Sequence, residues 1–280
     1  MERFVSTQHE WLAVHRGDLP LVISFPHTGT ELPPDLEDQL VSPWLARKDA
    51  DFWVDVLYDF ARELGATTVR TSISRTVIDL NRDPTGASLY PGYATTGLCP
   101  LTTFDGEPLY QRAREPDAGE IKRREQKYFW PYHQALVDET QRLGARHGGM
   151  VLYDAHSIRS RVARLFEGAL PQFNIGTDNG ATCSPVLTES IERVCDASGM
   201  SRVTNGRFRG GWITRHYGNP RSGIHAIQME LAMRGYLLEP KEFSADTWPA
   251  PLDDGHAALL RVALRDILDV CIAFATGKSA

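Results

Sequence analysis

Short apolar runs and amphipathic helical segments alternate along this chain of 280 residues. Each apolar run has the length of a buried strand, and each longer segment repeats its apolar residues at helical spacing. This alternation predicts an α/β sandwich, in which helices cover both faces of a mostly parallel, mixed sheet. We expect strands at 21–26, 66–73, 150–155 and 225–231, and helices at 49–64, 120–146, 185–197 and 254–275.

Several residues should interrupt or end these segments. Gly65 follows the predicted helix 49–64 and should stop it, because glycine readily adopts the left-handed conformation that ends helices. Pro131 should kink or split the predicted helix 120–146, because proline lacks an amide hydrogen and crowds the preceding turn. The stretch 74–108 is rich in Pro, Gly, Asn, Asp and Thr, which predicts a long loop of the kind that often carries function.

Two histidines stand where ligands bind in sheets of this kind. His27 lies just past the predicted strand 21–26, and His156 just past the predicted strand 150–155. Ligands of open α/β sheets bind beyond the carboxyl ends of the strands, and neutral imidazole is a good ligand for divalent metals. A lone histidine is more often an ordinary residue, but two in equivalent positions favour a metal site. Asp154 shares a strand face with His156 and is predicted to orient its ring.

The third metal ligand is expected to be a carboxylate, since a catalytic zinc usually has three protein ligands and one open position. The sequence offers Glu31, Asp49, Asp51 and Asp55. Three of these acids crowd the start of the predicted helix 49–64, where acids also stabilise a helix N-terminus without binding a metal. The residue pattern therefore leaves the choice among the four acids open.

Composition narrows the class of protein further. The four cysteines have no paired spacing, which excludes a cysteine-rich zinc site and favours reduced thiols in the cytoplasm. The net charge of −6 argues against nucleic acid and anionic membranes as partners, and no apolar run is long enough to span a membrane. No repeat or linker interrupts the chain, so we expect one domain over residues 1–280; the number of chains that assemble stays open.

Glu230 ends a segment that lacks acidic residues. From Arg202 to Met229 the chain has five arginines, two histidines and no Asp or Glu. Strand alternation in 225–231 places Gln228 and Glu230 on one face. A carboxylate beside a metal-bound water can take its proton and pass it to a departing amine. The competing interpretation is a strand-end glutamate that pairs with a neighbouring arginine.

Arginines are the predicted anion-binding groups, because guanidinium binds carboxylate through two parallel hydrogen bonds. An anionic ligand explains why an acidic protein keeps so basic a segment. Arg82 and Arg215 are the first candidates for clamping substrate carboxylates, and Asn81 and Arg209 are expected beside them. Arg75 is predicted to polarise a substrate carbonyl. Any single one of these arginines could instead be a solvated surface charge.

Six segments of the chain together resemble the N-formylglutamate amidohydrolase family. They run in order from about residue 20 to 240, and the ordered set is specific although each alone is weak. The resemblance implies an α/β fold related to zinc carboxypeptidases and aspartoacylase-type acylases. It also implies hydrolysis of N-formyl-L-glutamate to L-glutamate and formate in bacterial histidine degradation. The segments are SFPHTGTELP (24–33), DADFWVD (49–55), SRTVIDLNRDP (74–84), LYDAHS (152–157), NGRFRGGWITRHYGNP (205–220) and HAIQMELAMRGY (225–236).

The resemblance also implies roles for individual residues. His27 and His156 look like the metal-binding histidines of the family's relatives. Asn81 and Arg82 look like the pair that binds the substrate carboxylate. Glu230, followed by a leucine, looks like the residue that acts as the base.

One position departs from the relatives' pattern. They place a glutamate ligand three residues after the first histidine, and this chain has Thr30 there. We therefore expect Asp51, in the segment 49–55, to bind the one divalent ion, with zinc expected first and Co²⁺ or a similar ion as the alternative. The expected substrate is a small dianionic N-acyl amino acid. Two alternatives stay open: hydrolysis of another N-acyl amino acid, and metal-free carboxylate binding on the same fold.

Overall fold

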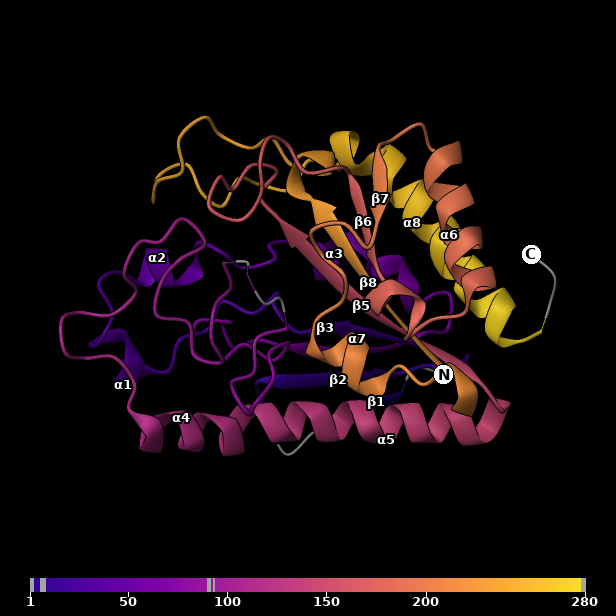
Figure 1. Ribbon diagram of the computed structural model, residues 1–280, viewed down its shortest axis with the longest axis horizontal. Helices are drawn as coiled ribbons and strands as arrows, with labels where there is room; N and C mark the ends of the chain where they lie inside the picture. The colour runs from indigo at the N-terminus through magenta and orange to yellow at the C-terminus, as the bar shows by residue number, and fades with distance from the viewer. Residues whose placement is uncertain (1–2, 6–8, 90–91, 93, 278–280) are drawn as a thin grey trace.

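A mixed sheet of eight strands forms the centre of the protein, as seen in a computed structural model that describes residues 3–5, 9–89, 92 and 94–277 (Figure 1). The strand order is β1-β2-β4-β3-β5-β8-β6-β7. The pairs β3–β4, β3–β5, β5–β8 and β6–β7 are parallel, and the other neighbours are antiparallel. The predicted α/β class is therefore confirmed. The strands are β1 (Arg3–Val5), β2 (Leu12–Arg16), β3 (Leu21–Phe25), β4 (Thr67–Thr71), β5 (Met150–Ile158), β6 (Phe173–Gly176), β7 (Arg202–Thr204) and β8 (Ile224–Ala232).

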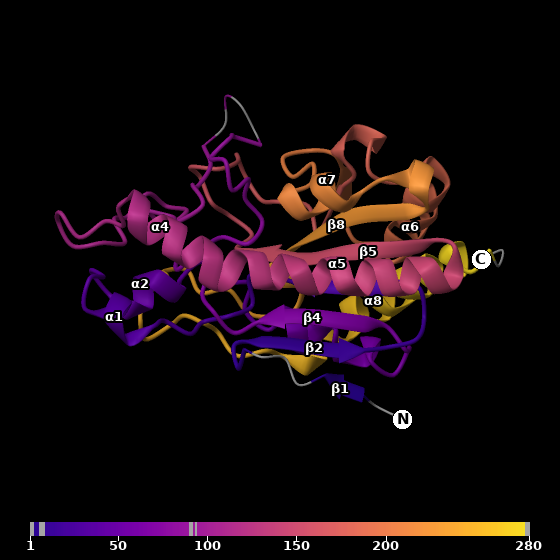
Figure 2. The ribbon, with the colours of Figure 1, turned by 90° about the horizontal axis from the view of Figure 1, so that it is seen from below.

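Helices cover both faces of this sheet. α5 lies along one face, and α6 and α8 lie together against the other (Figures 1 and 2). Within β5, Leu152 packs in the core on the α5 side and Tyr153 in the core on the α8 side, so the strand is buried on both faces and reads as a continuous apolar run. The helices are α1 (Pro34–Glu37), α2 (Pro43–Arg47), α3 (Val54–Leu57), α4 (Ala118–Arg124), α5 (Trp130–His147), α6 (Pro185–Ala197), α7 (Trp212–Tyr217) and α8 (Asp254–Ala275).

Five short helical segments complete the described part of the fold. Four are 3-10 turns, and η2 is a π-helical turn. None of the described helices has the combination of length and apolar character that crossing a membrane requires. The segments are η1 (Asp59–Ala61), η2 (Glu125–Phe129), η3 (Asp178–Gly180), η4 (Pro220–Ser222) and η5 (Met233–Gly235).

The predicted helix 49–64 is wrong. The structure has only the single turn α3 and the short η1 there. The backbone N–H of Asp51 donates to the carbonyl of His27 (2.9 Å), and Trp53 adopts a left-handed conformation with φ of 65°. A helix cannot pass through a left-handed residue, so α3 begins only after Trp53. The contact of Asp51 with His27 therefore outweighs the apolar periodicity, which alone would favour a helix.

The predicted helix 120–146 forms without a split at Pro131. α4, η2 and α5 follow one another directly and lie end to end in Figure 1. The π-helical turn immediately precedes the first turn of α5, which contains Pro131. A change of helical type there accommodates a residue that has no amide hydrogen to donate. The interruption is therefore a local change of helix type.

The strand predicted at 150–155 is longer than expected. β5 continues to Ile158, because its pairing with β8 continues to Ala232. His156 therefore lies within the strand, where the sequence had suggested a position just after it. The described part of 74–108 has no helix or extended strand, as predicted; residues 90, 91 and 93 lie outside the described chain.

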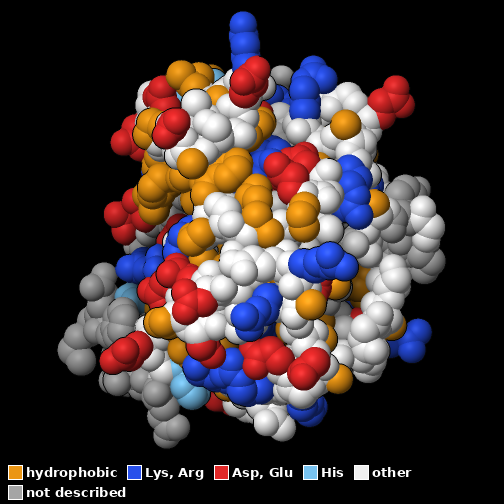
Figure 3. Space-filling model, turned by 90° about the vertical axis from the view of Figure 1, so that its left-hand side faces the viewer, with side chains coloured by type: hydrophobic (Ala, Val, Ile, Leu, Met, Phe, Trp, Pro, Cys, Tyr) orange, Lys and Arg blue, Asp and Glu red, His pale blue; other side chains and the backbone are white. Residues whose placement is uncertain are grey.

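The loops that follow the parallel strands gather at one end of the sheet, on the left of Figure 1. Figure 3 shows the molecule from that end, where hydrophobic side chains form one patch among interspersed acidic and basic groups. The segment 74–108, α1 and α2 all belong to this end of the molecule. The sheet thus provides a fixed edge, and the loops around it are free to form a pocket.

Candidate active site

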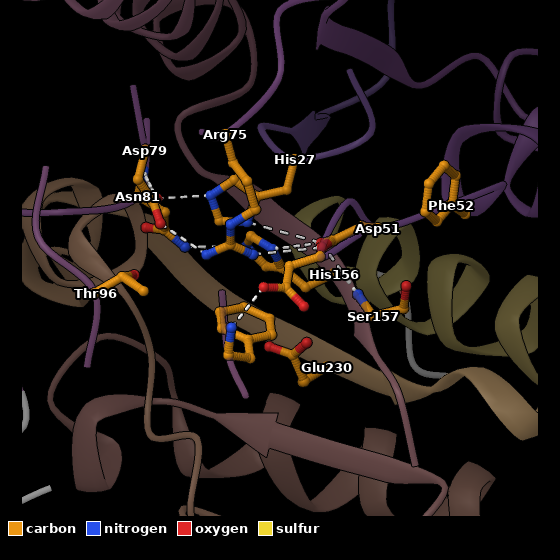
Figure 4. Close-up of polar contacts among 12 residues, drawn as sticks. His27, Asp51, Phe52, Arg75, Asp79, Asn81, Thr96, His156, Ser157 and Glu230 are labelled. Carbon is orange, nitrogen blue, oxygen red and sulfur yellow. Dashed lines mark hydrogen bonds and ion pairs between the residues drawn. The ribbon is translucent and has the colours of Figure 1, made fainter. Parts of the chain in front are cut away.

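Three adjacent parallel strands place three functional side chains at one edge of the sheet. His27 follows β3 by two residues, and His156 lies near the end of β5. Glu230 on β8 is the direct pairing partner of His156. Because the strands are neighbours and run in the same direction, these side chains come together, and Figure 4 shows them around a common space.

His27, Asp51 and His156 form a cluster that can hold a metal ion. One ligand atom from each lies within 4.8 Å of the others. Asp51 Oδ2 is 3.0 Å from His156 Nδ1 and 3.8 Å from His27 Nδ1, and all three side chains are buried. Within the described part of the chain, neither His27 Nδ1 nor Asp51 Oδ1 has a hydrogen-bond partner. Buried polar atoms are almost always paired, so these two atoms fit a site for a cation.

Asp51 is the one candidate acid that the structure brings to the two histidines. Its position depends on the backbone hydrogen bond to His27 and on the N–H of Ser157, which donates to its Oδ2 (3.2 Å). The other three acids bind elsewhere. Glu31 accepts from Ser72, Asp49 accepts from Arg159 and from the N–H of Phe104, and Asp55 pairs with Arg70.

A further carboxylate contacts the opposite nitrogen of each imidazole. His27 Nε2 is 2.7 Å from Asp79 Oδ1, and His156 Nε2 is 2.9 Å from Asp154 Oδ2. These contacts favour the proton on Nε2 and leave Nδ1, which faces Asp51, available as a ligand. The predicted contact between Asp154 and His156 is confirmed. The contact of Asp79 was missed, because only the fold brings it to His27.

Burial and neighbouring charges act differently on the two imidazoles. Burial lowers the pKa of His27, and the positive charge of Arg75 lowers it further. Burial also favours a low pKa for His156, but the carboxylates of Asp154 and Asp51 outweigh it and raise the pKa well above the usual value. A bound cation takes the place of the proton on such a ligand nitrogen. The cluster is therefore chemically suited to exchange a proton for a metal.

Glu230 is a buried carboxyl group that faces the same space. Its side chain accepts a hydrogen bond from Gln228 Nε2 (3.1 Å), and Gln228 Oε1 accepts one from the N–H of Gly211 (2.7 Å). Burial raises the pKa of Glu230 to about 8; the charge of His156 opposes this rise, and that of Asp51 adds to it. A carboxyl group that titrates in this range can both accept and donate a proton near neutral pH. The supporting role of Gln228 was missed, although alternation had placed it on the face of Glu230.

Arg75 lies directly beside the metal-binding cluster. Its Nη2 is 2.7 Å from Asp79 Oδ2, and its Nη1 is 3.6 Å from Asp51 Oδ1. The guanidinium also lies over the ring of Phe104, with its carbon 4.7 Å from the ring centre. It is a buried, fixed positive charge next to two imidazoles and two carboxylates. Such a charge can stabilise negative charge that develops on a reacting oxygen.

The cluster opens into a pocket with an empty volume of about 550 Å³, part of which is open to solvent. Three arginines line it: Arg75, Arg82 and Arg207. Arg82 donates to the backbone oxygen of Thr96 (3.1 Å) and Arg207 to that of Ala94 (2.9 Å). The segment 94–96 thus holds two of the three cations. The remaining lining residues include Phe104, Ile158, Leu165 and Phe208.

Two of the predicted carboxylate-binding arginines do not line this pocket. Arg209 Nε donates to the carbonyl of Gly206 (3.3 Å), and Arg215 lies 3.4 Å from Asp178. Arg207 belongs to the same basic segment and lines the pocket in their place. No local signal distinguishes Arg207 from Arg209, since they are two residues apart in an irregular stretch.

Asn81 lines the pocket, and both ends of its amide also bind within the protein. Its Nδ2 donates to Asp154 Oδ2 (2.9 Å), and its Oδ1 accepts from the N–H of Ile213 (2.8 Å). Gly211 lies against the same side chain, because a Cβ atom at that position would be 2.4 Å from the amide of Asn81. These contacts hold Asn81 beside Asp154, and its carboxylate-binding role stays a prediction.

Comparisons with known proteins identify the family of the chain. The profile of the N-formylglutamate amidohydrolase family matches residues 19–237. An N-formylglutamate deformylase of Pseudomonas putida is 50% identical over 234 residues, which cover 83% of this chain and 87% of the relative. An N-formylglutamate deformylase of Pseudomonas aeruginosa is 46% identical over 260 residues, which cover 92% and 96%.

Solved structures show the same fold. The N-formylglutamate amidohydrolase of Ralstonia eutropha superposes with a TM-score of 0.75 at 26% identity, over 94% of this chain and 96% of the other. A protein of Agrobacterium tumefaciens superposes with a TM-score of 0.67 at 17% identity, over 98% of both chains. The second similarity concerns the fold alone.

Proposed function

The chain belongs to the N-formylglutamate amidohydrolase family and acts as a deformylase of that family, and we propose that it hydrolyses N-formyl-L-glutamate with the help of one divalent metal ion. The products are L-glutamate and formate. The observation that carries the proposal is the buried cluster of His27, Asp51 and His156 beside Glu230, in which His27 Nδ1 and Asp51 Oδ1 have no hydrogen-bond partner among the described residues. Two imidazoles and one carboxylate form a ligand set that suits zinc, with Co²⁺ or a similar ion as the alternative.

His27, Asp51 and His156 would hold the ion. A divalent ion in such a site supplies two effects when bound: it polarises a carbonyl oxygen and increases the acidity of water. Asp79 and Asp154 keep the imidazole rings in place through their hydrogen bonds to Nε2.

Glu230 is the proposed base and acid. It accepts a proton from the water that attacks the formyl carbon and delivers this proton to the amine nitrogen of the departing glutamate. Its burial favours this use, because a buried carboxylate is a stronger base than an exposed one. Arg75 is placed to stabilise the negative charge that develops on the formyl oxygen.

The two carboxylates of the substrate are proposed to bind Arg82 and Arg207. Both arginines line the pocket, and guanidinium groups are well suited to bind carboxylates. Arg207 takes the role that the sequence analysis assigned to Arg209 and Arg215. Two cations on the lining suit a dianionic substrate, although the protein has a net charge of −6.

The biological setting follows from the family. We place the reaction in bacterial histidine degradation, because the resemblance described above implies that pathway. We place it in the cytoplasm, where the four cysteines, all free and buried, remain reduced.

Metal removal and one substitution test the proposal together. Protein treated with a chelator should lose turnover of N-formyl-L-glutamate and regain it with Zn²⁺ or Co²⁺. Glu230→Gln should lower kcat by about 10³-fold or more, with metal content unchanged and KM little changed, because only proton transfer is lost. Glu189→Gln, on the exposed surface of α6, is the matched control and should behave as wild type. Full turnover by rigorously metal-free protein would reject the metal-dependent mechanism.

A further inference from the structure

Part of the pocket wall is apolar and lies next to the metal-binding cluster. Ile158 follows His156 by two residues on β5, so both side chains share one face of the strand. Ile158 pairs with Ala232 on β8, two positions beyond the pair of His156 and Glu230. Its side chain is therefore the next one along the sheet from the reacting groups.

Phe104 completes this apolar wall. Its ring lies against the guanidinium of Arg75, which itself lies 3.6 Å from Asp51. Phe104 and Ile158 are buried members of one hydrophobic cluster, and both line the pocket. The wall therefore stands beside the cluster on the side of Arg75 and the end of β5.

A chain of charged groups fixes the position of this wall. Asp49 Oδ2 accepts the backbone N–H of Phe104 at 2.6 Å, and Asp49 Oδ1 pairs with Arg159 Nη2 at 2.9 Å. The second amino group of Arg159 pairs with Asp105, 2.8 Å away. Asp105 also pairs with Lys48 at 2.7 Å. Hydrogen bonds between charged groups are the strongest kind, so the turn that carries Phe104 cannot easily move away from the site.

The groups suited to the amino acid part of a substrate are a different set of lining residues. Arg82 and Arg207 are both attached to the segment 94–96, through Thr96 and Ala94. Phe104 and Ile158 offer no side-chain donor for a carboxylate. A substrate with its carboxylates on the arginines and its carbonyl at the metal-binding cluster therefore turns its acyl group toward the apolar wall.

We propose that Phe104 and Ile158 determine the acyl specificity of the enzyme by leaving room for formyl and excluding larger acyl groups. The inference rests on the proposed function and adds the residues that set its selectivity. A formyl carbon carries only a hydrogen, whereas acetyl adds a methyl group that a tightly held wall cannot accommodate. One methyl group at a packed wall changes kcat/KM by about 10–200-fold.

Kinetics with N-formyl-L-glutamate and N-acetyl-L-glutamate test the wall. In wild type, kcat/KM for the acetyl substrate should be at least about tenfold below that for the formyl substrate. Phe104→Leu and Ile158→Val remove volume from the wall, and each should raise the acetyl-to-formyl ratio by about tenfold. Leu170→Val is the matched control, because Leu170 belongs to the same hydrophobic cluster but does not line the pocket. Its ratio should equal that of wild type.

The outcomes separate the two proposals. Failure of wild type to deformylate N-formyl-L-glutamate would reject the proposed function itself. Wild type that cleaves both substrates equally well would overturn the proposed wall, even if neither variant folds. An unchanged ratio in both variants, with metal content and unfolding temperature retained, would overturn it as well.

Discussion

Two arginine-bearing segments approach the site, and they differ in how their charge is used. In 74–82, Arg75 and Arg82 both line the pocket, and between them Asp79 contacts His27 and Asn81 contacts His156. In 202–221, five arginines occur without a single acid, yet only Arg207 lines the pocket. The segment with fewer positive charges therefore contributes more of them to the site.

The acids that neutralise the second segment come from other parts of the chain. Arg202 pairs with Asp196 at 2.7 Å and with Glu192 at 3.2 Å, and Arg215 lies 3.4 Å from Asp178. In the first segment, Arg75 is 6% exposed and is held between two carboxylates of the site. Excess charge along the sequence thus says little about charge in the pocket. Burial beside the reacting groups distinguishes the two segments.

Among the substitutions that compare the two segments, Arg75→Ala should have the largest effect, and it tests the importance of the first segment. We expect kcat/KM for N-formyl-L-glutamate to fall by about 10²–10³-fold, because a buried donor at a developing negative charge contributes that much. Steady-state kinetics with metal analysis would measure it. Arg75→Lys keeps the positive charge but not the planar guanidinium group, so its kcat/KM should fall less than that of Arg75→Ala. Arg75→Ala with more than a tenth of wild-type kcat/KM would remove this contrast between the segments.

A pair of substitutions within the second segment comes next in size. Arg207→Ala should raise KM by about 10–100-fold, since hydrogen bonds to charged groups contribute about 1.5–3 kcal/mol. Arg209→Ala is the matched control two residues away and should leave KM within about twofold, because its contact is to the backbone of Gly206. Initial-rate kinetics on both variants would decide. A larger rise in KM for Arg209→Ala would reverse the assignment.

His133 links the two segments and predicts a smaller, pH-dependent effect on stability. Its Nε2 is 2.9 Å from the carbonyl of Leu80, and its Nδ1 is 3.0 Å from the hydroxyl of Tyr217. Burial lowers the pKa of His133 to about 3. As the pH falls, His133 therefore becomes protonated near pH 6.5 in the unfolded chain but only near pH 3 in the folded chain. Stability from this group is complete above pH 6.5 and is lost as the pH falls.

Urea unfolding between pH 4.5 and 6 would measure this effect. The free energy of unfolding of wild type should fall by about 1.4 kcal/mol per pH unit more steeply than that of His133→Gln, which cannot take up the proton. The difference between the two slopes removes the contribution of carboxyl groups that both proteins share. Equal slopes would mean that burial does not keep His133 neutral in the folded protein.

Elements with strong local signals were predictable from the sequence. α6 and α8 have the predicted bounds, because each combines helical spacing with a polar residue before its first turn. The strands predicted at 21–26 and 150–155 were found because burial on both faces makes these segments largely apolar. β6 and β7, only four and three residues long, carry too little pattern to be recognised. The helix predicted at 49–64 was wrong because Asp51 contacts His27, which is distant in the sequence. Local periodicity cannot reveal such a contact.

The candidate site was predictable where a residue's place follows from its strand. His27, His156 and Glu230 follow from strand ends and alternation, and the structure brings them together. Asp51 needed the family resemblance, since four acids were equally suitable by local sequence. Arg207 could not be distinguished, because the direction of its side chain depends on loops far away along the chain.

The pairing of His156 with Glu230 separates two kinds of evolutionary change. Both residues stand on one rung of β5 and β8, and a slip of one residue would turn Glu230 away from the site. The relative position of these two side chains is therefore fixed by the register of the sheet. The turn of Phe104 lies outside the sheet, so a new acyl preference can evolve there while the hydrolytic apparatus is left intact.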